Sequence, residues 1–292
     1  MNILLAFFSA SAHSVNSVAL RLYQTRLQQK PADLRLYQSL YMFLAAFGYL
    51  LCTGLQPRLD GAGLVLALCY GLDLAMTGTL VTAYYLCGPM SVTSVITNAC
   101  VALPIAVGCI FYREVMTLPQ ILGCLLLGVT FLLSGLGGKE SSSRPQKKWY
   151  LLVALAFFAN GMGAVLLNIY GRVAGAGERN SFLALGYAVA AVLYLLIHKG
   201  EAAKTGKTDI RSFLKPLAMV LVVLSATGGF VGNGLLMSLN TKLPASVLYP
   251  MVNGGIGVIV AVVSCTFFRE KLTLQKLLAI LTGLGAIVLL NL

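Results

Sequence analysis

Long apolar stretches alternate with short polar connections along the whole chain. Each stretch runs for about 20 residues, the length that an α-helix needs to cross the hydrocarbon core of a bilayer. Helices are the expected spanning form, because every backbone group must find a partner where there is no water. We therefore predict an all-α integral membrane protein with ten transmembrane helices, at residues 2–20, 37–55, 62–86, 89–112, 119–137, 149–170, 181–198, 216–239, 244–268 and 274–291.

The second half of the chain repeats the first. The sequence FYREVMTL at 111–118 is echoed by FFREKLTL at 267–274, and Tyr49-Leu50-Leu51 is echoed by Tyr194-Leu195-Leu196. A unit with an odd number of spans, duplicated in tandem, crosses the membrane in opposite senses, as in many transporters. We predict two inverted five-helix repeats. The first covers 1–137, the second covers 149–292, and a polar, Ser-rich linker at 138–148 joins them.

Composition supports a membrane protein. Hydrophobic residues make up 58% of the chain and charged residues 10%, whereas soluble domains carry roughly 25% charged residues. The net charge of +12 would suit nucleic-acid binding, but the basic residues lie in the connections between spans. There they set topology. The predicted partner is a lipid bilayer, in a multi-pass arrangement in the cell membrane, and nucleic acid is not an expected partner.

The basic residues also give an orientation. Of the 21 Lys and Arg residues, 16 lie in the connections that follow spans 1, 3, 5, 7 and 9, when Lys276 at the start of span 10 is counted with the connection before it. The positive-inside rule then places these connections in the cytoplasm and both termini outside.

Two ionisable residues lie deep within predicted spans, where a charge is costly and usually functional. Asp73 is near the middle of the third span, on one helical face with Tyr70 and Thr77, and His13 shares a face of the first span with Asn16. We expect these five side chains to line a polar substrate cavity, with Asp73 and His13 coupling protons or balancing a cationic substrate. The alternatives are a protonated Asp73 that bonds neighbouring hydroxyls, and a His13 that serves packing.

Amide side chains form a second group of candidates. Asn98 and Asn253 occupy matching places in spans 4 and 9, and Asn160 and Asn233 lie within spans 6 and 8. They would either contact substrate or join helices through hydrogen bonds. Tyr249 precedes Pro250 in span 9, where a proline either kinks the helix or frees a carbonyl for a ligand.

Other features point to packing. Arg113-Glu114 and Arg269-Glu270 stand at span ends, where we expect them to form caps and ion pairs. Gly228 and Gly232 have the spacing of closely packed membrane helices. No nucleophile–base arrangement, phosphate-binding loop or metal-ligand spacing is present, and the seven cysteines lie in or beside apolar spans. No enzyme activity, cofactor or metal is therefore expected.

The ten-span layout, with Pro89-Met90-Ser91 entering span 4 and FYREVMTL leaving it, resembles the drug/metabolite transporter superfamily, EamA-like family. The run LPASVLYP at 243–250 with the following GGIG at 254–257 is also similar to the small multidrug-resistance exporters. This resemblance implies peripheral fifth and tenth spans and cytoplasmic termini, opposite to the charge count. The exporters couple protons through a glutamate in the first span, where this chain has His13.

Together these features predict a secondary transporter of small organic solutes, working by alternating access around a central polar cavity. Amino acids, related metabolites or amphipathic cations are the expected substrates, because no cluster of intramembrane Lys or Arg is present to bind phosphate. Export is the expected direction. A proton-independent uniporter or exchanger of sugars or other metabolites, and a membrane-embedded lipid-handling scaffold or enzyme, remain alternatives. A homodimer is also left open.

Overall fold

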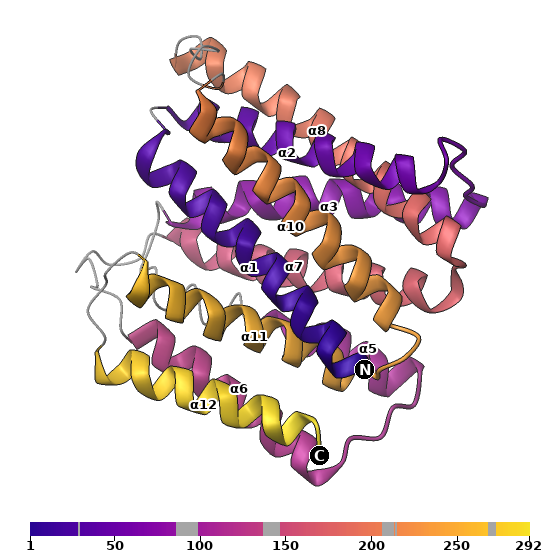
Figure 1. Cartoon of the computed structure of the whole chain (residues 1–292), viewed down its shortest axis with the longest axis vertical. Coiled ribbons are helices and arrows are strands. Elements are labelled where there is room, and N and C mark those ends of the chain that lie inside the picture. The colour runs from indigo at the N-terminus through magenta and orange to yellow at the C-terminus, as the bar shows by residue number, and fades with distance from the viewer. Residues whose placement is uncertain (29, 86–98, 137–146, 206–212, 214, 268–272) are drawn as a thin grey trace. The chain divides into compact units, whose positions relative to one another are not determined.

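The computed structural model is helical, and no strand occurs among the residues that it describes, namely 1–28, 30–85, 99–136, 147–205, 213, 215–267 and 273–292 (Figure 1). In chain order the helices are α1 (Asn2–Arg26), α2 (Pro31–Cys52), α3 (Gly61–Tyr85), the 3-10 turn η1 (Ala99–Val101), α5 (Ala102–Phe111), α6 (Leu118–Leu136), α7 (Lys147–Val173), α8 (Ala176–Thr205), α10 (Pro216–Leu239), α11 (Ala245–Thr266) and α12 (Leu274–Leu290).

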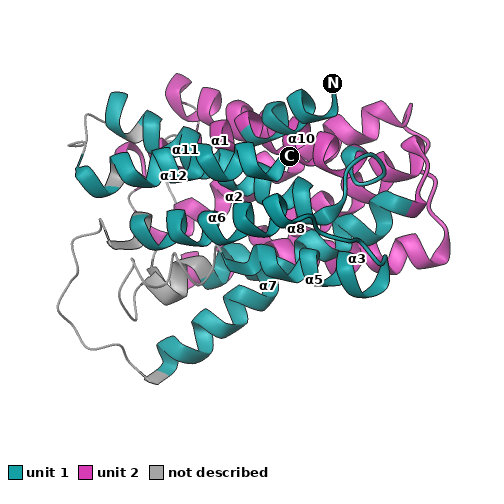
Figure 2. Cartoon of the chain, turned by 90° about the horizontal axis from the view of Figure 1, so that it is seen from below, with its two compact units in different colours: residues 1–10, 76–172, 239–292 teal, residues 11–75, 173–238 magenta. Residues whose placement is uncertain are grey.

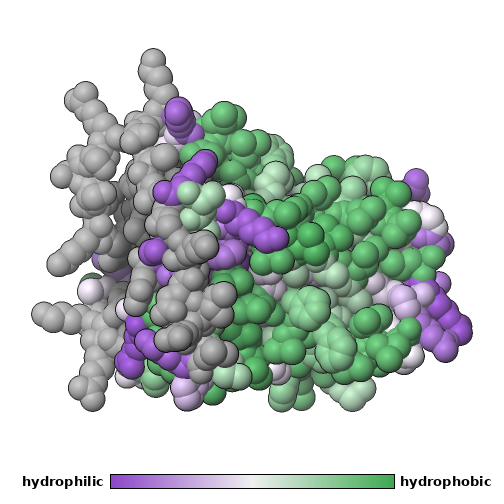
Figure 3. Space-filling view, turned by 90° about the horizontal axis from the view of Figure 1, so that it is seen from above, coloured by the Kyte–Doolittle hydropathy of each residue, from purple (hydrophilic) through white to green (hydrophobic). Residues whose placement is uncertain are grey.

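Six of the described helices are long and apolar enough to cross a bilayer: α1, α3, α7, α8, α10 and α11. The apolar stretches at 99–111, 118–133 and 277–290 are shorter. Bulky apolar side chains lie exposed along the helices, and Figure 3 shows hydrophobic residues over much of the surface in view. So much exposed apolar surface is expected where the solvent is lipid. The chain is therefore membrane-embedded, as predicted, and the count of ten spans stays a prediction.

Helix α2 is not among these six helices. Its most apolar stretch has a lower mean hydropathy than theirs, because α2 carries Arg35 and several tyrosines. Its polar side chains are buried against other helices of the same unit. Ser39 donates to the carbonyl of Ala191 on α8 at 2.8 Å, and Tyr37 donates to the carbonyl of Leu221 on α10 at 3.0 Å. These bonds explain how a helix with a lower hydropathy is accommodated in an apolar bundle.

Several helices run past the apolar stretches from which they were predicted. Helix α1 continues to Arg26 instead of ending near residue 20, α2 begins at Pro31 instead of 37, and α8 covers Ala176–Thr205 instead of 181–198. Polar residues at the ends of a membrane helix continue its hydrogen bonding into the interface, so hydropathy marks only the central part of each helix. Of the predicted fourth span, only residues from 99 onward are described.

The chain divides into two compact units, and each combines segments from both halves of the sequence (Figure 2). Unit 1 contains Met1–Ala10, Met76–Arg172 and Leu239–Leu292, and unit 2 contains Ser11–Ala75 and Val173–Ser238. The predicted repeats at 1–137 and 149–292 thus do not coincide with these units. A repeat is a feature of sequence, whereas a unit groups helices that pack together, so the two divisions need not agree. The predicted repeats stay a prediction.

Within unit 2, α2 packs along α8, and within unit 1, α6 packs along α12. The α6–α12 contact contains Leu127, Phe131 and Ala286, all buried, together with a hydrogen bond of 3.0 Å from the hydroxyl of Thr130 to that of Thr282. Helix α11 packs against α12, α5 and α6 in the same unit. Of these helices, α11 carries two of the candidate site residues, Tyr249 and Asn253.

Candidate functional site

The two units divide the predicted site residues between them. Unit 2 holds His13, Asn16, Tyr70, Asp73 and Asn233, and unit 1 holds Thr77, Asn160, Tyr249 and Asn253. Asn98 lies outside the described residues.

In unit 2, His13 and Asn16 lie where α1 approaches α10. A Cβ atom added to Gly232 would lie 2.8 Å from Nε2 of His13, and one added to Gly228 would lie 3.1 Å from Cβ of Asn16 and 2.5 Å from the carbonyl oxygen of Ala12. Only glycine fits at these two positions without a shift of the neighbouring helix. The close helix contact predicted from the glycine spacing is therefore confirmed.

Asn16 retains hydrogen-bonding capacity. Its Oδ1 atom is buried and has no hydrogen-bond partner among the described residues. In unit 1, the Oγ1 atom of Thr77 is likewise buried without a hydrogen-bond partner among the described residues. A buried polar atom without a partner costs about 1–3 kcal/mol, so such atoms are candidates for contact with a bound molecule or an ordered water.

Asp73 and Tyr70 both lie on the buried face of α3, as their spacing predicted. The ring of Tyr70 stacks on Phe182 of α8, with 5.4 Å between the ring centroids. Asp73 is 7% exposed, and among the described residues no side chain or backbone N–H donates a hydrogen bond to its carboxylate. A charged carboxylate in this position would need a cation or several donors. Asp73 is thus the strongest candidate in unit 2 for binding a proton or a substrate cation.

Asn233 is hydrogen-bonded to one tyrosine, and a second tyrosine packs against the ring of the first. Its Nδ2 donates to the hydroxyl of Tyr187 at 2.6 Å, and that hydroxyl in turn donates to the carbonyl of Gly229 at 3.3 Å. The ring of Tyr49 lies 5.7 Å from that of Tyr187. One donor of Asn233 is therefore occupied in joining α10 to α8, which gives this residue a packing role beside any contact with substrate.

In unit 1, Asn160 and Asn253 behave alike. Each donates through Nδ2 to the carbonyl four residues earlier in its own helix, Asn160 to Ala156 at 2.8 Å and Asn253 to Tyr249 at 2.9 Å. Neither amide oxygen accepts a hydrogen bond from a described residue. Both side chains are half-buried. Their oxygens therefore remain able to accept hydrogen bonds from a solute.

Tyr249 is 1% exposed, and its hydroxyl donates to the carbonyl of Ala164 on α7 at 2.8 Å. Pro250, the next residue, does not interrupt α11, which runs continuously from Ala245 to Thr266. The proline has no N–H for the carbonyl of Ser246, and the thiol of Cys124 lies 4.0 Å from this oxygen instead. The structure thus gives Tyr249 an interhelical bond and gives Pro250 a place within an unbroken helix.

Glu114 and Arg172 form a polar centre that the sequence only partly indicated. Arg113 has a left-handed backbone, with φ of 53°, and this turn lets the N–H of Glu114 bond the carbonyl of Gly108 at 3.2 Å. The carboxylate of Glu114 then accepts the N–H groups of Ala245 and Ser246 at 3.0 and 3.2 Å. These are first-turn donors of α11, so Glu114 caps this helix as the span-end position predicted.

Arg172, at the end of α7, completes this centre. Its guanidinium forms an ion pair with Glu114, lies 4.1 Å from the ring centroid of Tyr112, and donates from Nε to Oδ1 of Asn168 at 3.2 Å. Asn168 donates to Asn240 at 3.1 Å. The sequence did not show which partners Arg172 and Asn240 would meet, because contacts between residues so far apart in the chain depend on helix packing. The signal that was available, basic residues near span ends, was assigned to topology.

No protein-family model matches the chain, and no curated protein matches it in sequence. A solved structure described only as the crystal structure of a protein is similar in three dimensions, with a TM-score of 0.67 and 12% sequence identity. The similarity covers 100% of this chain and 98% of the other. The chain therefore shares its fold with a solved structure, and at this identity the likeness concerns the fold alone.

Proposed function

We propose that this chain is a secondary transporter of small organic solutes, of the kind found in the EamA-like family of the drug/metabolite transporter superfamily. Amino acids, related metabolites or amphipathic cations are its proposed substrates, and export is the proposed direction. The two predicted repeats would rock about a central site and expose it to each side of the membrane in turn.

The observation that carries this proposal is Asp73. It is a buried acid within an apolar helix, and its carboxylate receives no hydrogen bond from the described residues. A purely structural acid in a membrane protein is normally paired, as Glu114 is with Arg172. An acid without such a partner is suited to take up a proton or a substrate cation during a transport cycle.

The packing of equivalent helices supports the repeat. In unit 2, α2 packs against α8, and in unit 1, α6 packs against α12 and α5 against α11. Each pair joins the helices that correspond in the two predicted repeats. Such self-pairing is expected around a pseudo-twofold axis, on which an inverted repeat is built.

The competing proposal is a membrane-embedded scaffold or enzyme that handles lipids. An enzyme of this kind would gather acids or histidines at the helix ends. Among the described residues, Glu114 and Glu201 are such acids, but Glu114 is engaged by Arg172 and by the first turn of α11, and Glu201 is paired with Arg35. This engagement favours a structural role for Glu114 and therefore favours transport.

A ligand screen tests the proposal. Full-length protein in detergent would be heated with amino acids, polyamines, quaternary ammonium compounds, sugars and nucleotides, and its unfolding followed. A ligand that binds the native state stabilises it by about 2.7 kcal/mol at a hundredfold excess over its dissociation constant. We expect stabilisation by one chemical class. If none of these solute classes stabilised the protein and only lipids did, the result would contradict the proposal and support the scaffold.

A further inference from the structure

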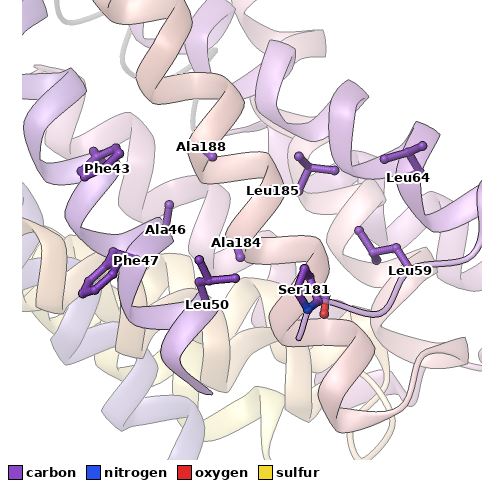
Figure 4. Close-up of a pocket in the computed structure, with 11 residues that line it drawn as sticks. Phe43, Ala46, Phe47, Leu50, Leu59, Leu64, Ser181, Ala184, Leu185 and Ala188 are labelled. Carbon is purple, nitrogen blue, oxygen red and sulfur yellow. The ribbon is translucent and has the colours of Figure 1, made fainter. Parts of the chain in front are cut away.

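A cavity of about 480 Å³ lies in unit 2 between α2, α8 and the connection that leads from α2 to α3 (Figure 4). Phe43 and Phe47 project from α2 on one side, and Leu59 and Leu64 lie on the other. Helix α8 passes between them and presents small residues, including Ala188. The hollow exists because the small side chains of α8 stand between bulky side chains on both sides.

The walls of this cavity are open to the surroundings of the protein. Phe43 is 65% exposed, Phe47 is 47% exposed and Leu64 is 46% exposed. In a membrane-embedded chain, exposed apolar side chains of this size face lipid. The volume falls within the range of about 300–1,000 Å³ that is usual for ligand pockets. The cavity is therefore large enough for a hydrocarbon chain and accessible from the bilayer.

The cavity offers a polar solute little to bind. Ser181 is the polar residue among the described residues that line it, and its hydroxyl is already engaged. It accepts the N–H of Arg58 at 2.9 Å and donates to the carbonyl of Gly177 at 2.9 Å. An apolar occupant is therefore favoured over a hydrogen-bonding one.

A basic residue, Arg58, lies beside the cavity. Arg58 follows Pro57 and precedes Leu59, both of which line the cavity, and its backbone is held to α8 by the bond to Ser181. Its side chain is exposed. The nearest acid along the chain, Asp60, caps α3 by accepting the N–H of Gly63 at 2.8 Å, and none of the ion pairs among the described residues joins it to Arg58. Arg58 lies between the end of α2 and the start of α3, at the level where lipid phosphates are expected.

We propose that this cavity is a binding site for one phospholipid, whose acyl chain fills the hollow beside α8 and whose phosphate pairs with Arg58. The apolar walls, the opening towards lipid and the cation beside the cavity match the two parts of such a molecule. The site requires only that the chain is membrane-embedded, and it does not depend on what the protein transports.

Native mass spectrometry of the full-length protein, freed of co-purified lipid in detergent, tests this site. The probe is palmitoyl-oleoyl phosphatidylglycerol, compared with diacylglycerol, which lacks phosphate, and with glycerol 3-phosphate, which lacks acyl chains. We expect one tightly bound phosphatidylglycerol, weaker binding of diacylglycerol and no binding of glycerol 3-phosphate. Arg58→Gln should weaken phosphatidylglycerol binding about fivefold, and Ala188→Phe, which fills the hollow, should abolish the tight site.

Two matched variants control for general effects. Lys242→Gln removes an exposed basic residue from a connection in unit 1, and Ala154→Phe adds the same bulk to an exposed alanine of α7. Both should bind phosphatidylglycerol as the unchanged protein does. The proposal would be overturned if Arg58→Gln and Ala188→Phe bound phosphatidylglycerol as tightly as the unchanged protein does. It would also be overturned if the unchanged protein bound diacylglycerol and phosphatidylglycerol with equal affinity.

Discussion

Tyr49 and Tyr194 make the same kind of hydrogen bond from opposite halves of the sequence. Tyr49 of α2 donates to the carbonyl of Phe230 on α10 at 2.5 Å, and Tyr194 of α8 donates to the carbonyl of Leu74 on α3 at 3.0 Å. Both rings are 1% exposed. In the predicted repeats, α2 corresponds to α8 and α3 to α10, so each tyrosine bonds the third helix of the other repeat. This reciprocity is what a duplicated unit would produce.

Removing either hydroxyl should therefore have a similar effect. Tyr49→Phe and Tyr194→Phe each lose one bond to a helix carbonyl, and we expect each to lower the free energy of unfolding by about 0.5–1.5 kcal/mol. Unfolding in mild detergent, followed by circular dichroism, measures both. Tyr150→Phe, at a 62% exposed tyrosine, serves as the control and should leave stability unchanged. A loss confined to one of the two buried tyrosines would contradict their equivalence.

The close contact between α1 and α10 leaves no room for a side chain at Gly232. Gly232→Ala would press a methyl group against the imidazole of His13, and we expect a loss of about 1–3 kcal/mol in stability. Gly257→Ala is the matched control, because no atom lies within 4 Å of the added Cβ, and it should be neutral or slightly stabilising. Thermal unfolding of both variants in the same detergent gives the comparison. Equal stability of the two would show that the helices are further apart than described.

The ion pair between Glu114 and Arg172 should be strongly coupled. The two side chains are 8% and 19% exposed, so removing one leaves the other buried without its partner, at a cost of about 3–5 kcal/mol. Glu114→Gln, Arg172→Gln and the double variant form a thermodynamic cycle, and we expect a coupling of about 1–3 kcal/mol. Glu178→Gln changes an exposed residue that caps α8, and it should lower the free energy of unfolding much less. Additive effects of the two changes would contradict the pairing.

Much of the fold could be predicted from hydropathy. The membrane class and most helices follow from the apolar stretches, because lipid requires each spanning segment to satisfy its own backbone. The role of Glu114 as a cap and the packing roles of Gly228 and Gly232 were also predictable from their positions at a span end and at close-packing spacing. The grouping of helices from both halves into each unit was not, because hydropathy carries no information on which helices are neighbours.

The candidate site was less predictable. The sequence correctly indicated that Tyr70 and Asp73 share a buried face, since helical spacing determines it. It did not indicate that Asn160 donates to its own helix, that Asn233 bonds Tyr187, or that Tyr249 bonds α7. A buried amide or hydroxyl can bond a neighbouring helix or a solute, and only the positions of the other helices decide between these partners.

The proposed role of Asp73 is to bind a proton or a substrate cation during the transport cycle. The most direct measurement is exchange of a radiolabelled ligand, of the class identified by the stabilisation screen, across proteoliposomes that contain the purified chain. Asp60→Asn is the control, since an asparagine also caps α3 and the residue is exposed. We predict that the unchanged protein and Asp60→Asn exchange the ligand, and that Asp73→Asn, although folded, does not. Exchange by Asp73→Asn with unchanged rate and unchanged pH dependence would contradict the account.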